Sequence, residues 1–225
     1  SKEFSYLIFQ GSRLGYGNYL ESKIIPSFRA ISYFTGKAFW RLDVKWTDSY
    51  SRDADGSVVY YKDTLYAPLE NSLLTLIDPN DTSIINGLNQ PRVFYELPLY
   101  TKKDVALHKK NIVTEGSACQ IGDSLFIASG SGHVYGYNMQ TRTLFWDFYI
   151  GSDIDGSVIH TSDSCILVSV EKQYIDGKGG IFKLDYKKHP DSSVVWYYPV
   201  EDKEFAGWKG GVIGSVGIND TYQTD

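Results

Sequence analysis

Residues 56–66 read GSVVYYKDTLY, and this stretch decides the fold because it recurs along the chain. Residues 116–126 read GSACQIGDSLF and residues 156–166 read GSVIHTSDSCI, so in all three copies an aspartate follows the glycine at the same spacing. A shorter copy, GSVGINDTY, spans residues 214–222. Each copy predicts a short strand, an Asp-centred turn and a second strand.

The second half of each unit also repeats, and it ends in an aromatic residue. Residues 28–40 match residues 134–146 position by position, which aligns Trp40 with Trp146. Residues 181–185 begin a third copy that ends at Trp196, and residues 74–78 begin a fourth that ends near Phe94 and Tyr95. Four strands per unit of about 40 to 60 residues are typical of a propeller blade. The sequence therefore predicts an all-β protein, a β-propeller of four-stranded antiparallel blades.

The unit boundaries predict a single propeller domain over residues 1–225. The blade units cover about 5–44, 56–98, 116–150 and 156–200, and the first unit lacks a candidate first strand. Residues 212–218 look like such a strand, so they could complete the first blade and close a ring of four. The alternative is a fragment of a seven- or eight-bladed propeller.

Glycine and tryptophan have structural roles in this prediction. The glycines of the repeat would let inner strands crowd near the propeller axis, where a Cβ would clash; they are Gly56, Gly116 and Gly156. The tryptophans would wedge between neighbouring blades, and burying one contributes on the order of 3 kcal/mol; they are Trp40, Trp146 and Trp196.

The run AISYFTGKAFW at residues 30–40 resembles the tryptophan-docking motif of the PQQ-like quinoprotein propeller repeats, Ala-x-Asp-x-x-Thr-Gly-Lys-x-x-Trp. Ser32 stands where the family has Asp. The copy that ends at Trp196 keeps Asp185 but has a longer turn, and the copy that ends at Trp146 is weaker. The resemblance spans nearly the whole chain. It implies the fold and no particular activity, because such repeats occur in dehydrogenases and in non-catalytic envelope proteins alike.

The resemblance also implies what a quinone-dependent dehydrogenase would need. Its parts are a quinone in the axial funnel, a calcium ion, a catalytic Asp and a vicinal disulfide, often with a haem attached through Cys-x-x-Cys-His. Cys119 and Cys165 are the two cysteines, so the sequence has neither adjacent cysteines nor the haem motif. It also has no Gly-x-Ser-x-Gly elbow. We therefore expect no catalytic residues, no quinone and no haem.

Two acid pairs are the candidate metal ligands. Asp53 and Asp55 precede the first copy of the repeat, and Asp153 and Asp155 precede the third. Hard oxygen ligands two residues apart on a turn could hold Ca²⁺, although calcium needs three or more further ligands. The equivalent stretch before the second copy keeps only Glu115. The alternative is that these acids cap turns by accepting backbone N–H bonds.

Composition excludes some partners, and loop lengths suggest others. The net charge of −5 argues against nucleic acid, which needs a basic stripe, and no apolar run reaches the roughly 18 residues of a membrane span. Binding could use the long connections, since loops on a rigid scaffold commonly carry it; they are residues 14–26, 82–90, 102–111, 171–180 and 199–208.

We predict a non-enzymatic scaffold that binds a protein or a glycan through loops on one face. The resemblance to envelope propellers implies a periplasmic, cell-envelope or secreted setting. The alternative function is a degenerate quinoprotein or another propeller enzyme, either a dehydrogenase, a lyase or a hydrolase, with its site in the axial funnel.

Overall fold

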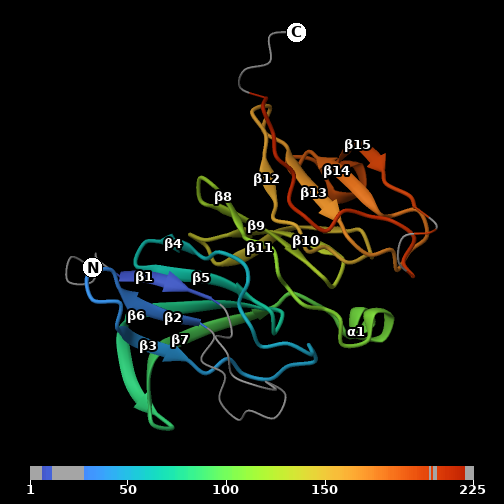
Figure 1. Cartoon of the computed structure of the whole chain (residues 1–225). Helices are drawn as coiled ribbons and strands as arrows, with labels where there is room; N and C mark the ends of the chain where they lie inside the picture. Colours follow the sequence, from blue (N-terminus) through green and yellow to red (C-terminus); the bar gives the residue numbers. More distant parts are fainter. Residues whose placement is uncertain (1–6, 12–27, 203, 205–206, 221–225) are drawn as a thin grey trace.

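A computed structural model describes residues 7–11, 28–202, 204 and 207–220 of the chain. Its strands form four antiparallel sheets that follow one another in sequence (Figure 1). The first sheet has the order β1-β2-β3, from β1 (Leu7–Gln10), β2 (Phe28–Ser32) and β3 (Ala38–Leu42). This arrangement confirms the predicted all-β propeller with successive antiparallel blades.

The next three sheets each have four strands in sequence order. The second blade contains β4 (Val59–Tyr61), β5 (Thr64–Leu69), β6 (Leu73–Ile85) and β7 (Leu88–Pro98). The third contains β8 (Cys119–Ile121), β9 (Ser124–Ser129), β10 (His133–Asn138) and β11 (Thr143–Tyr149). The fourth contains β12 (Ile159–His160), β13 (Ile166–Val170), β14 (Gly180–Leu184) and β15 (Val194–Pro199).

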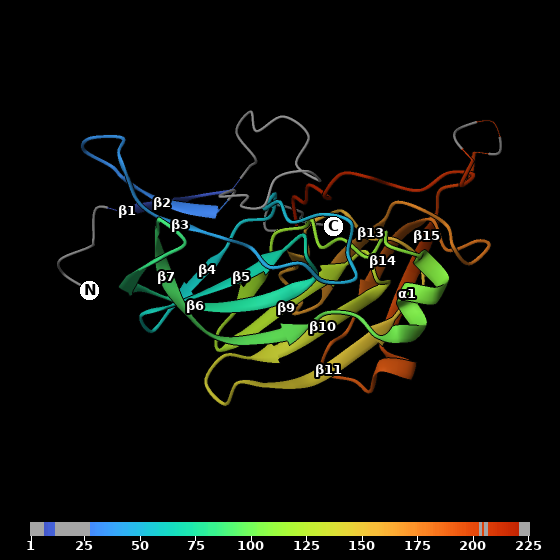
Figure 2. The same ribbon diagram turned by 90° about the horizontal axis from the view of Figure 1, so that it is seen from below.

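Within the described ranges, one short α-helix and a single 3-10 turn, η2 (Pro190–Ser192), interrupt the strands. In α1 (Lys102–His108) the Thr101 side chain accepts a bond from the Asp104 N–H, and the Asp104 carboxylate accepts one from the Thr101 N–H. This reciprocal capping box satisfies two backbone donors at the helix start. Figure 2 shows α1 beside the third and fourth blades. Sequence reasoning treated residues 102–111 as a loop. Among the described residues no helix has the length and apolar character needed to span a membrane.

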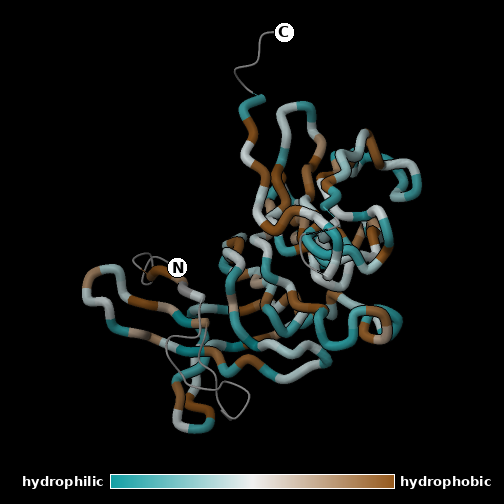
Figure 3. Tube along the Cα trace, turned by 45° about the vertical axis from the view of Figure 1, so that its right-hand side comes forward, coloured by the Kyte–Doolittle hydropathy of each residue, from teal (hydrophilic) through white to brown (hydrophobic). Residues whose placement is uncertain are grey.

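Apolar side chains fill the spaces between consecutive blades. One cluster joins the first and second blades through Trp40 and Leu65, and another joins the second and third through Leu76 and Ile127. A third cluster, which includes Trp146, joins the third and fourth blades. Figure 3 shows hydrophobic stretches alternating with hydrophilic ones along the chain trace. Burial between blades therefore holds the sheets in their stacked order.

The glycine-serine repeats form a ladder across the blades. The Ser57 N–H donates to Ser117 Oγ, the Ser117 N–H to Ser157 Oγ, and the Ser157 N–H to Ser215 Oγ, each at 2.9 Å. A Cβ on Gly56 would lie 2.6 Å from the carbonyl oxygen of Gly116, and one on Gly116 would lie 2.7 Å from that of Gly156. The backbone segments of neighbouring blades approach so closely that only glycine fits at these positions. A clash with a Cβ is the reason expected from the sequence for these glycines.

The tryptophans occupy equivalent register positions but differ in burial. Trp40 pairs with Ala30, Trp146 with Gly136 and Trp196 with Lys183, each next to a bulge in the hairpin. The indole N–H of Trp40 donates to the Pro79 carbonyl of the next blade, and that of Trp146 donates to the Lys188 carbonyl. Trp196, however, is 43% exposed. Its predicted place between two blades is therefore wrong for the described residues, because no described blade follows the fourth.

The predicted completion of the first blade by residues 212–218 is not seen. The Val212 N–H donates to the Val170 carbonyl, and the Ser169 hydroxyl donates to the carbonyl of Gly214. These residues therefore lie against the fourth blade, and the first sheet keeps three strands among the described residues. The physical reason is the ladder, since Ser215 takes the same place against Ser157 that Ser157 takes against Ser117.

Candidate functional site

The acid pairs precede the first strands of two blades, and each pair belongs to a cluster of three acids. Asp53 and Asp55 come before β4, and Asp153 and Asp155 come before β12. The structure adds a third acid to each pair, Glu70 just after β5 and Glu171 just after β13. In each group, one carboxylate oxygen per residue lies within 4.8 Å of the others. We call these the second-blade and fourth-blade acidic groups.

Sequence reasoning missed Glu70 and Glu171, although a signal was available. Each is an acid directly after the buried second strand of its blade, where the third blade has Gly130. Glu115, the single acid predicted for the third blade, interacts with Asp155 and so connects the third blade to the fourth-blade acidic group. The loop before the first strand and the end of the second strand therefore converge on one region of each blade.

Burial dominates the electrostatics of these acids. Burial, together with the neighbouring carboxylates, raises the pKa of Glu70 and of Asp153 to about 8 and that of Asp155 to about 7. Burial also raises the pKa of Glu171. Lys172 opposes this effect, since its Nζ lies 3.8 Å from Asp153 Oδ2. Glu70 in the second-blade group, and Asp153, Asp155 and Glu171 in the fourth-blade group, thus hold protons more strongly than exposed acids do.

Several acid oxygens accept hydrogen bonds, and one of these, to Asp53, is the backbone turn cap of the alternative interpretation. Asp53 Oδ1 accepts from the Ala54 N–H at 3.0 Å, and the Ser51 hydroxyl donates to Glu70. Asp153 Oδ2 accepts from the Asn111 amide at 2.7 Å. Three carboxylates could also present oxygens to a hard cation such as Ca²⁺. Calcium binding by Asp53, Asp55, Asp153 and Asp155 stays a prediction.

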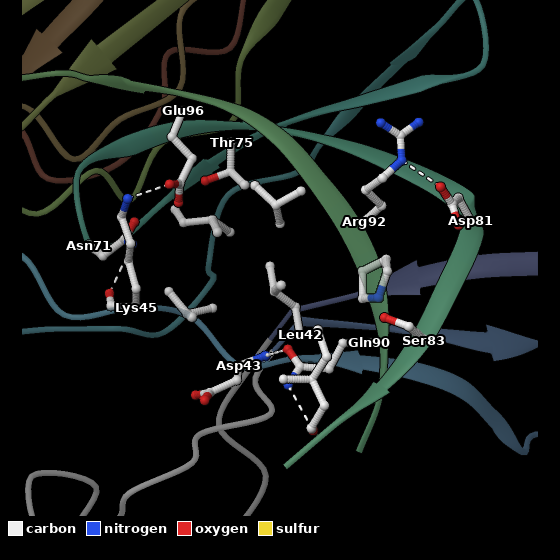
Figure 4. Close-up of a pocket in the computed structure, with 15 residues that line it drawn as sticks. Leu42, Asp43, Lys45, Asn71, Thr75, Asp81, Ser83, Gln90, Arg92 and Glu96 are labelled. Atoms are coloured by element: carbon white, nitrogen blue, oxygen red, sulfur yellow. Dashed lines mark hydrogen bonds and ion pairs between the residues drawn. The ribbon is translucent and has the colours of Figure 1, made fainter. Parts of the chain in front are cut away.

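A cleft of about 430 Å³ lies between the first two blades (Figure 4). One side carries Lys45, Asn71, Thr75 and Glu96, and the lower edge in this view carries Asp43 and Gln90. The other side carries Asp81, Ser83 and Arg92. The long β6–β7 hairpin forms much of it, so the 82–90 connection singled out in the sequence contributes a wall. No cleft-lining residue was among the sequence-predicted site residues.

The polar side chains of the cleft are held by each other. Lys45 Nζ donates to the Glu96 carboxylate, and Arg92 Nε donates to Asp81 Oδ2 at 2.5 Å. Gln90 Oε1 accepts from the Asp43 N–H at 2.9 Å. These contacts fix the side chains before any ligand arrives and pair both cations of the lining with acids.

Thr75 differs from its neighbours in the cleft. It is 1% exposed, and its hydroxyl has no hydrogen-bond partner among the described residues. Leaving a buried hydroxyl unpaired costs about 1–3 kcal/mol. Among the described residues, Thr75 is therefore a fully buried group of this lining with free hydrogen-bonding capacity.

The cysteines do not form the vicinal disulfide that the resemblance to quinone-dependent dehydrogenases implies. Cys119 lies half-buried in β8 of the third blade, and Cys165 lies buried on the fourth, just before β13. Both are free thiols on different blades, so they cannot supply a vicinal disulfide. The described residues therefore do not fit that part of a quinone site.

The fold and the cleft together define a β-propeller with a polar ligand-sized cleft. Solved structures show a similar fold. BamB from Moraxella catarrhalis is 17% identical with a TM-score of 0.50, and the match covers 86% of this chain and 46% of that one. Quinohemoprotein alcohol dehydrogenase from Comamonas testosteroni is 11% identical with a TM-score of 0.55 over 78% of this chain and 33% of its own.

A quinohemoprotein alcohol dehydrogenase from Pseudomonas putida gives similar values, 14% identity and a TM-score of 0.53, over 76% of this chain and 31% of its own. This chain therefore shares the propeller fold of these structures, and it spans less than half of their length. No protein-family model and no curated protein sequence matches it.

Proposed function

We propose that this chain is a non-enzymatic propeller module that binds a glycan in the cleft between its first two blades. The observation that carries the proposal is the buried, unpartnered Thr75 hydroxyl in a lining of pre-organised polar groups. The volume of about 430 Å³ lies within the usual range for small-ligand sites. The likeness to envelope propellers supports a periplasmic, envelope or secreted setting.

The charge pattern of the cleft supports a neutral polyhydroxyl ligand over a charged one. Lys45 is paired with Glu96, and Arg92 with Asp81 and Asp78, so neither cation is left for a phosphate or a carboxylate. A sugar hydroxyl both donates and accepts, which matches amide, carboxylate and hydroxyl groups side by side. We therefore favour a glycan over a protein segment.

The test is a binding assay on an array of immobilised oligosaccharides, followed by calorimetry with the saccharide that binds best. Thr75→Val should weaken binding at least tenfold while leaving the melting temperature unchanged or higher, because it removes an unpaired buried hydroxyl without changing the side chain's shape. Thr143→Val, on an exposed position of the third blade, is the matched control and should bind as the parent does.

Two results would overturn the proposal. One is a protein that binds none of the saccharides on the array. The other is a peptide library that yields a peptide whose binding Thr75→Val abolishes while saccharides bind weakly or not at all. That result would make the cleft a protein-binding site.

A further inference from the structure

A second pocket lies between the end of α1 and the loop after β13, away from the cleft. It has a volume of about 390 Å³. His108, Lys109, Lys110 and Asn111 line it from one connection, and Lys172 and Tyr174 line it from the other. Two of the long connections noted in the sequence, residues 102–111 and 171–180, therefore meet here.

His108 is the unusual member of this lining. Its side chain is buried at 2% exposure, and neither ring nitrogen has a partner among the described residues. The ring packs edge-on against Tyr174, with centroids 4.2 Å apart. Burial lowers the pKa of His108 to about 4, so at neutral pH the imidazole carries one N–H donor and one acceptor. The nearby Asp104 carboxylate instead serves Thr101 and lies 3.4 Å from His133.

The charged and polar neighbours are partly fixed in place. The Asn111 amide donates to Asp153 Oδ2 at 2.7 Å and to the Tyr174 hydroxyl at 2.8 Å. Lys172 Nζ lies 3.8 Å from Asp153 and 5.0 Å from the centre of the Trp208 ring. A rigid floor of this kind lowers the entropy lost when a ligand binds.

Lys109 adds an observation of a different kind. It ends α1 with φ +59° and ψ −124°, a backbone conformation that residues with side chains rarely adopt. Such strain costs of order 1–3 kcal/mol and gathers at ligand sites. Lys109 and Lys110 are both exposed, so their amines are free to face a ligand at the mouth of the pocket.

We propose that this pocket binds a tetrahedral oxyanion, the phosphate or sulfate group of a ligand. Lys109 and Lys110 supply positive charge as flexible point donors, which suits phosphate oxygens, whereas Lys172 is already paired with Asp153 and Glu171. His108 supplies an N–H donor from the wall. The site shares no residue with the glycan cleft, so each proposal can fail without the other.

The experiment titrates the whole chain with inorganic phosphate and sulfate by calorimetry, with chloride at matched ionic strength as the reference. Parallel arms use glucose 6-phosphate and glucose 6-sulfate, which show whether a sugar carries the group. Lys109→Gln with Lys110→Gln should weaken binding at least tenfold. The matched control is Lys187→Gln with Lys188→Gln on the fourth blade, which removes the same charge from exposed positions and should change binding less than twofold.

His108→Phe keeps a ring against Tyr174 and removes both nitrogens. It should weaken oxyanion binding severalfold with an unchanged or higher melting temperature, because no existing hydrogen bond is lost. Equal weakening by the two lysine pairs would mean general electrostatic attraction and would overturn the site. Absence of binding at millimolar phosphate and sulfate would overturn it too.

Discussion

The second-blade and fourth-blade acidic groups share one sequence pattern and differ in their surroundings. Asp153 is 4% exposed, whereas Asp53 is half-buried and Asp55 is exposed. Asn111 donates to Asp153, and Lys172 lies beside it. Both residues belong to connections that the repeat does not specify. The repeat thus fixes where an acid stands, and the insertions decide how strongly it holds a proton.

The tryptophans show the same contrast. Trp146 and Trp196 occupy the same register position of their hairpins, yet Trp146 is 5% exposed and Trp196 is 43% exposed. A following blade covers Trp146, whose indole N–H reaches the Lys188 carbonyl. Equivalent residues therefore need not contribute equally to stability.

The largest difference should come from the tryptophans. Trp146→Ala is expected to lower the free energy of unfolding by about 3–5 kcal/mol, because it leaves a cavity between two blades. Trp196→Ala should cost about 1 kcal/mol or less, since much of the ring already contacts water. Urea denaturation of both variants measures the two values. Equal losses would mean that Trp196 is buried in solution.

The glycine ladder gives the next effect. A Cβ on Gly116 would lie 2.7 Å from the Gly156 carbonyl oxygen, while one on Gly214 meets nothing within 4 Å. Gly116→Ala should therefore destabilise the chain by about 1–3 kcal/mol through overpacking, and Gly214→Ala should change stability little. Thermal melting of the pair checks this. A large loss of stability in Gly214→Ala would show that the backbone is packed more tightly around Gly214 than the structure indicates.

The acidic groups should make stability depend on pH. The pKa of Asp153 is about 8 in the folded chain and about 3.9 when unfolded. The folded state thus keeps a proton that the unfolded state releases between those values, so the contribution of Asp153 to stability falls as the pH rises from about 4 towards 8. Asp153→Asn should reduce the loss of unfolding free energy between pH 5 and pH 8 by on the order of 1–3 kcal/mol.

The control for that slope is Asp53→Asn in the second-blade group, which should leave the pH dependence largely intact because Asp53 is less buried. The measurement is denaturation at pH 5, 6.5 and 8. Equal flattening by both variants would mean that the two groups have the same environment in solution.

The smallest effect is expected from calcium. At pH 6.5 we expect equal melting temperatures in Ca²⁺ and in chelator, because the raised pKa values of Glu70 and Asp153 keep protons on these acids. At pH 8.5 a bound ion would raise the melting temperature by mass action. A rise that Asp155→Asn abolishes and the exposed-loop variant Asp176→Asn keeps would establish a calcium site and reject the turn-cap alternative.

Much of the candidate site was out of reach of sequence reasoning. The cleft combines residues 43–45 with the β6–β7 hairpin, and the oxyanion pocket combines the end of α1 with residues 172–174. Neither combination could be found from a fixed spacing in the sequence, because insertions of different length bring these segments together. The metal-candidate acids were found only in part, since Glu70 and Glu171 approach the pairs from the far end of another strand.

The sequence by itself determined the blade. A blade needs strands of alternating side chains, an Asp-centred turn and a glycine where backbones touch. These requirements are local, so each copy of GS…D meets them again. Trp40 and Trp146 accordingly occupy their expected positions between blades. Tertiary structure alone decided what each copy faces. No blade covers Trp196 in the part of the chain that the structure describes, residues 212–218 extend the ladder beyond Ser157, and Asp153 is buried where Asp55 is exposed. Burial and pKa depend on neighbours distant in sequence, and a repeat carries no information about which neighbours it will have.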